Sequence, residues 1–169
     1  TQAYANAGNS MATGTRANAT GTDAIAAGVC ALADQLGAMA FGGYAQATGN
    51  NSTAVGASAN ATANSATAIG TSAIATGVNA LALGESSQAT QRDAFAAGAG
   101  ACALANGSTA LGELAIASAN NASALGTKAN ASGINAIAIG TQTVANSTDA
   151  FAGGFKASAL AKSAMALGS

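Results

Sequence analysis

The stretch NSTAVGASANATAN occupies residues 51–64, and SATAIGTSAIATGV follows it at residues 65–78. Both carry Ala, an apolar residue and Gly at the same places, fourteen residues apart. The glycine recurs at this spacing along the whole chain, with Ala two residues before each one. Such regularity predicts one supersecondary unit stacked on itself, and therefore a single repeat domain over residues 1–169. The repeat glycines are Gly14, Gly28, Gly42, Gly56, Gly70, Gly84, Gly98, Gly112, Gly126, Gly140, Gly154 and Gly168.

Each fourteen-residue unit is too short for two helices and their turns, but it accommodates two short strands and two turns. Residues from four before the repeat glycine to the glycine itself alternate between small and bulky side chains, as on the two faces of a strand. A second strand is expected from two to six residues after the glycine, with Ala at almost every position three and five residues after the glycine. Asn, Asp, Ser or Gly stands five residues before each glycine and predicts a turn.

The small faces of the two strands must meet, because only Ala, Ser and Gly fit between closely apposed sheets. The sequence therefore predicts an all-β fold: a parallel β-solenoid, or β-roll, of 14-residue coils. About 12 coils stacked at about 4.8 Å give a rod about 58 Å long. The repeat glycines are interpreted as corners of this solenoid, where the backbone adopts unusual angles.

The bulky face of the first strand would leave an apolar strip in water along the whole rod. Burying one large apolar side chain contributes roughly 1.5–3 kcal/mol, so the strip is expected to be an interface between copies packed around a common axis. The number of copies does not follow from this argument. The expected interface residues are Ile25, Met39, Phe41, Val55, Ile69, Leu81, Leu83, Phe95, Leu111, Leu125, Ile137, Ile139, Phe151 and Leu167.

The segments NSTAVGASA (51–59), NALALGESS (79–87) and NAIAIGTQT (135–143) resemble the repeat of YadA-like heads in trimeric autotransporter adhesins. The resemblance implies a left-handed parallel β-roll and a homotrimer. It also implies a non-enzymatic virulence factor of the adhesin and haemagglutinin type, exposed on the outer membrane of a Gram-negative bacterium. Its partners would be itself and a host cell-surface or extracellular-matrix protein. Since no stalk or anchor is recognised, the chain is expected to be a head fragment of a longer surface protein.

Composition argues against catalysis, cofactors, metals and nucleic acid. The chain has no His, and only 7% of its residues are charged, with a net charge of −1. Histidine is the commonest general base and metal ligand, and a basic field is needed to bind nucleic acid. Asp23, Asp93 and Asp149 share one turn position several coils apart, so we interpret them as turn residues and not as a catalytic pair. We expect no catalytic, cofactor-binding or metal-binding residues.

The remaining alternatives are an ice-binding or purely structural spacer solenoid and, more remotely, a β-helical acyltransferase. Five Thr residues lie six residues after a repeat glycine, but Asp34, Leu104, Asn146 and Leu160 interrupt that row. The acyltransferases use six-residue steps and usually a His base, which this chain lacks. Cys30 and Cys102 would lie about 25 Å apart in the solenoid, too far for a disulfide, so both are expected to be free thiols.

Overall fold

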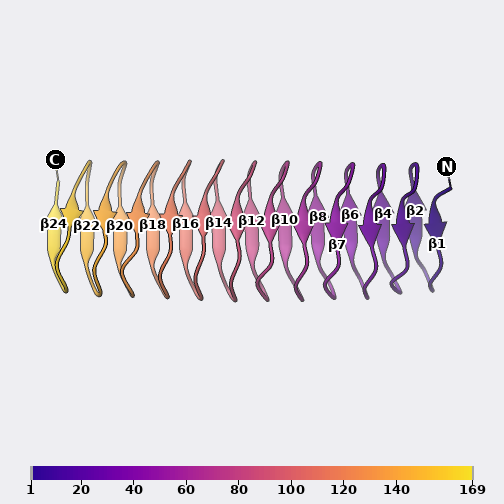
Figure 1. Ribbon diagram of the computed structural model, residues 1–169, viewed down its shortest axis with the longest axis horizontal. Helices are drawn as coiled ribbons and strands as arrows, with labels where there is room; N and C mark the ends of the chain where they lie inside the picture. Colours follow the sequence, from indigo (N-terminus) through magenta and orange to yellow (C-terminus); the bar gives the residue numbers. More distant parts are fainter. Residues whose placement is uncertain (1, 169) are drawn as a thin grey trace.

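The computed structural model describes residues 2–168 as a rod of stacked two-strand coils, with the two termini at opposite ends (Figure 1). The strands form two parallel 12-stranded sheets, one from the odd-numbered and one from the even-numbered strands. The odd sheet contains β1 (Tyr4–Ala5), β3 (Asn18–Ala19), β5 (Leu32–Ala33), β7 (Gln46–Ala47), β9 (Asn60–Ala61), β11 (Ile74–Ala75), β13 (Gln88–Ala89), β15 (Cys102–Ala103), β17 (Ile116–Ala117), β19 (Asn130–Ala131), β21 (Val144–Ala145) and β23 (Ser158–Ala159).

The even sheet lies on the other side of the rod. It contains β2 (Met11–Thr13), β4 (Ile25–Ala27), β6 (Met39–Phe41), β8 (Thr53–Val55), β10 (Thr67–Ile69), β12 (Leu81–Leu83), β14 (Phe95–Ala97), β16 (Thr109–Leu111), β18 (Ser123–Leu125), β20 (Ile137–Ile139), β22 (Phe151–Gly153) and β24 (Met165–Leu167).

The register of both sheets follows the sequence repeat. Thr67 of β10 pairs with Leu81 of β12, and Ile69 pairs with Leu83, so each residue lies beside the one fourteen positions further on. The same offset holds in the odd sheet, where Ile74 pairs with Gln88. The predicted parallel β-solenoid of 14-residue coils is therefore confirmed.

The interior between the sheets is lined almost entirely by alanine methyl groups. Ala54, Ala59, Ala61, Ala66 and Ala68 are typical, each with 0% exposure. The largest fully buried side chains are Thr143, Ser52, Ser87 and Ser108. A methyl group buries little apolar area, so this interior stabilises the rod far less per residue than a core of Leu and Ile would.

The buried hydroxyl groups bond within their own turns, which removes the cost of burying them. Ser52 Oγ donates to the carbonyl of Gly49 at 2.7 Å and accepts from the Gly49 N–H at 3.2 Å. At the opposite corner, Thr143 Oγ1 donates to the carbonyl of Gly140 at 2.8 Å.

The repeat glycines form the predicted corners. From Gly14 to Gly154 they have φ between 100° and 142°, a region that side-chain-bearing residues rarely adopt. At Gly56 an added Cβ would lie 2.5 Å from the carbonyl oxygen of Gly70 in the next coil. Glycine is therefore required by both backbone angle and close stacking.

The predicted strands were too long. The even strands span three residues and the odd strands two, where five had been expected for each. The second strand begins late because the residue two positions after each repeat glycine lies in a turn: Tyr44, Ser58 and Ser72 have φ of 60°, 57° and 57°. That turn is held by the neighbouring coil, since the Ser72 N–H donates to the carbonyl of Ala57 at 2.9 Å.

Candidate functional site

The outer face of the even sheet carries the apolar strip, which we define as the bulky residues at the first and third positions of the even strands. The side chains of Phe41, Ile69 and Ile139 are 38%, 42% and 41% exposed, and most of the others are half-buried by their neighbours along the sheet. The structure thus places every predicted interface residue on one face of one sheet. The members are Ile25, Met39, Phe41, Val55, Ile69, Leu81, Leu83, Phe95, Leu111, Leu125, Ile137, Ile139, Phe151 and Leu167.

The outer face of the odd sheet is mixed and more polar. Gln46, Asn60 and Gln88 follow one another at the first position of their strands, with Ile74 between Asn60 and Gln88. The row of Thr residues beside them is partly exposed, and Thr76 Oγ1 donates to the carbonyl of Thr90 at 3.3 Å. This face therefore presents polar and apolar side chains at a regular spacing.

The turn before each even strand has the predicted left-handed residue five positions before the repeat glycine. Asn79, Asp93, Asn135 and Asp149 have φ between 55° and 59°. Their side chains form hydrogen bonds between coils: Asn79 Nδ2 donates to Asp93 Oδ1 at 3.0 Å, and Asn135 Nδ2 donates to Asp149 Oδ1 at 3.0 Å. The interpretation of these aspartates as turn residues is confirmed.

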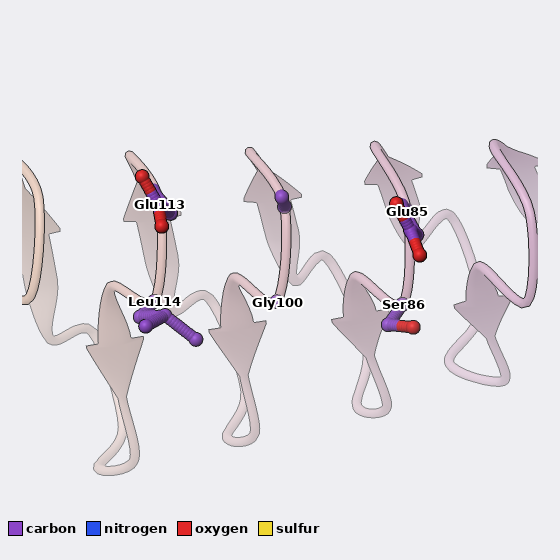
Figure 2. A pocket seen from close by; sticks show the side chains of 6 residues that line it. Glu85, Ser86, Gly100, Glu113 and Leu114 are labelled. Carbon is purple, nitrogen blue, oxygen red and sulfur yellow. The ribbon is translucent and has the colours of Figure 1, made fainter.

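The turn after the even strands contains a shallow hollow that the sequence analysis missed, here named the glutamate notch. Its volume is about 260 Å³, and Figure 2 shows Glu85 and Glu113 on the coils either side of the coil that carries Gly100. The volume lies below the roughly 300–1,000 Å³ of typical small-molecule sites, and is closer to the size of one side chain. The notch is lined by Glu85, Ser86, Ala99, Gly100, Glu113 and Leu114.

The notch exists because Gly100 has no side chain, whereas the equivalent residues of the neighbouring coils are Ser86 and Leu114. A Cβ at Gly100 would lie 2.8 Å from Leu114 Cδ2, so the Leu114 side chain leans over the glycine. Gly100 and the two glutamates were visible in the sequence. Their common location was not, because Gly100 had been assigned to the second strand and not to a turn.

The two cysteines are free thiols, as predicted. Cys102 is beside Ile116 in the odd sheet, and its thiol donates to the carbonyl of Gly100 at 3.4 Å. Partial burial raises the pKa of the Cys102 thiol above its ordinary value, which makes it a weaker nucleophile near neutral pH.

Residues 2–168 contain no group of three or more His, Cys, Asp or Glu side chains that could hold a metal ion. In the same part of the chain, no helix has the length and apolar character needed to cross a membrane.

The fold defines a parallel β-solenoid repeat protein with one apolar and one more polar long face. The YadA head domain repeat matches residues 5–29, 33–59, 47–73, 75–101, 103–129 and 131–157. The chain therefore belongs to the family of YadA-like heads of trimeric autotransporter adhesins. A comparison with curated proteins gave no match.

Proposed function

We propose that this chain is the head of a trimeric autotransporter adhesin, in which three copies pack through the apolar strip. The head would be displayed on the outer membrane of a Gram-negative bacterium and would attach it to host cells or matrix proteins. Membership of the YadA head family supports the adhesin role and the bacterial cell surface.

The apolar strip is the observation that carries the proposal. Within residues 2–168, the largest side chain that is fully buried between the sheets is that of Thr143, whereas the strip holds Leu, Ile, Phe and Met side chains of the even sheet. Association would bury these side chains, each worth roughly 1.5–3 kcal/mol when fully buried. It would leave the polar face of the odd sheet and its turns free to contact a ligand, and three weak contacts in one trimer would act together.

Two measurements test the proposal. Light scattering on the purified chain is expected to give a mass three times that of the chain. Solid-phase assays are expected to retain the trimer on at least one of collagen, fibronectin, laminin or an epithelial cell layer. A monomer at micromolar concentration would refute the assembly, and a trimer retained on none of these surfaces would refute the attachment. Thermal hysteresis of that trimer would instead support ice binding.

A further inference from the structure

The turns before and after β14 differ in charge. Arg92 is in the turn that precedes β14, whereas Ala99 and Gly100, the middle of the glutamate notch, follow β14 directly. Arg92 is exposed, and neither it nor Glu85 nor Glu113 has an ion-pair partner within residues 2–168. One free cation therefore lies at one edge of the even sheet, and two free anions lie at the opposite edge, one coil to either side of the cation's level along the rod.

Cyclic symmetry brings these two edges together. The strands run across the long axis of the rod (Figure 1), so strips that face a common axis form a ring of strands at each level. In a cyclic assembly of three copies the interfaces are heterologous, and because the strands run around the ring, the end of a strand in one copy lies beside the start of the same strand in the next. The turn after β14 of one copy then faces the turn before β14 of its neighbour.

The charges match at this contact. In such a ring Arg92 of one copy would face Ala99 and Gly100 of the next. Figure 2 shows that Glu85 is one coil away from Gly100 on one side and Glu113 one coil away on the other. Two coil steps separate the backbones of the two glutamates by about 10 Å, so carboxylates that lean inward from both sides could each accept hydrogen bonds from one guanidinium group with its five donors. The methylene groups of an arginine would cover Ala99 and Leu114, because long charged side chains pack their stems on apolar surface.

A second pair of residues matches at another level. Leu36 is in the turn before β6 and Tyr44 in the turn after it, and their side chains are 51% and 61% exposed. The same ring geometry places Leu36 of one copy beside Tyr44 of the next. An apolar contact and a charged contact thus follow from one arrangement.

A closed cyclic ring has no axial offset between its copies, but the strip alone does not disfavour a copy that is displaced by one coil from this arrangement. Bulky residues recur at every coil, so a slip of one coil again places apolar side chains against apolar side chains. The only two glutamates of the chain lie one coil to either side of the level of Arg92, so the unslipped arrangement is the one in which the arginine is near both carboxylates, whereas a slip of one coil leaves it level with one glutamate and two coils from the other.

We propose that Arg92 of one copy enters the glutamate notch of the next and fixes the axial register of the assembly. The proposal rests on the self-association put forward above. It makes the notch a site for a second copy of this chain.

A cross-linking experiment tests the contact directly. Arg92→Lys supplies an amine that a carbodiimide joins to a touching carboxylate, and a mixture of isotopically light and heavy chains separates links between copies from links within one. The expected product joins Lys at position 92 of one copy to Glu85 or Glu113 of another. The triple variant R92K/E85Q/E113Q is the matched control and is expected to lose this product. Links from position 92 to carboxylates of distant coils, or none between copies of an intact assembly, would overturn the proposal.

Charge reversal tests the energetic role. R92E is expected to raise the protein concentration at which the assembly half-dissociates by about tenfold or more, because the loss is repeated at every contact of the ring. The swapped variant R92E/E85K/E113K is expected to recover most of that loss, with circular dichroism confirming an intact fold in both. An R92E assembly as stable as the wild type, or a swap without recovery, would overturn the inference. A wild-type chain that remains single would refute the self-association itself.

Discussion

The α-carbon of Gly70 stacks so closely on the next coil that a Cβ at this position would lie 2.5 Å from the carbonyl oxygen of Gly84. The backbone of Gly70 has φ of 134°, so a side chain is disfavoured there on two independent grounds. We expect Gly70→Ala to lower the free energy of unfolding by more than about 2 kcal/mol. Urea unfolding followed by circular dichroism at one fixed protein concentration measures this.

The matched control is Gly43→Ala in the adjoining turn row. A Cβ at Gly43 would meet only the carbonyl oxygen of Val29, at 4.0 Å, and Gly43 is not among the glycines with positive φ. We expect this variant to be as stable as the wild type or slightly more stable, since alanine restricts the unfolded chain. Equal losses at Gly70 and Gly43 would contradict the assignment of the repeat glycines as required corners.

The alanine interior leaves no space for a larger side chain. Ala68 is 0% exposed in the middle of the even sheet, whereas Ala57 is exposed in a turn. We expect Ala68→Leu to destabilise the rod by about 1–3 kcal/mol or more, because three added carbon atoms must push the two sheets apart. Ala57→Leu is the control, and its midpoint in urea should match the wild type. A tolerated leucine at position 68 would show that the sheets are not closely apposed.

The coil length, the parallel register and the corners could be predicted from the sequence because the repeat glycines recur every fourteen residues without interruption. The interior could be predicted because small residues, mostly Ala, alternate with larger ones in both strands. The start of the second strand was misplaced for a physical reason. The left-handed turn residues there include Tyr44, Leu114 and Lys128, which have no preference for that conformation. Hydrogen bonds to the preceding coil impose it, as between the Leu114 N–H and the carbonyl of Ala99 at 2.9 Å.

The glutamate notch was missed as a consequence of that error. A residue two positions after a repeat glycine was expected in a strand, where a missing side chain would leave no hollow at an edge. Once these residues are placed in a turn, the absence of a side chain at Gly100 predicts a hollow there, with the two glutamates beside it. The strip, by contrast, was predictable because its bulky residues alternate with the small ones of the interior.

The reactivity of the Cys102 thiol tests whether this side chain is partly buried in solution. Its raised pKa means that less thiolate is present at pH 8 than in the unfolded chain, and its S–H already donates to Gly100. In a Cys30→Ser background we expect iodoacetamide to alkylate native Cys102 more slowly than the same thiol in denaturant. Mass spectrometry at timed intervals measures both rates.

The pH dependence of this reaction has a definite sign. A folded pKa above the unfolded one means that the stability contributed by the protonated thiol is present below the unfolded pKa and is lost as pH rises through the folded pKa. The thiolate is the form that reacts, and its fraction levels off above the pKa of the thiol. Because the pKa is higher in the folded chain, the alkylation rate of the native thiol should continue to rise at pH values where that of the unfolded thiol has levelled off. Superimposable profiles for the two states would contradict the burial of Cys102.

The two sheets should respond differently to the same polar substitution, although both present isoleucine to the outside. Ile69 in the even sheet and Ile116 in the odd sheet are 42% and 38% exposed, so the cost of placing a carboxylate on a single rod is similar at both. If the strip is the interface, Ile69→Asp desolvates one carboxylate per copy in the assembly, whereas Ile116→Asp leaves its carboxylate in water. We expect Ile69→Asp, and likewise Leu83→Asp and Ile139→Asp, to give monomers or aggregates by light scattering. Ile116→Asp should retain the wild-type mass, and loss of assembly in that variant alone would move the interface to the opposite sheet.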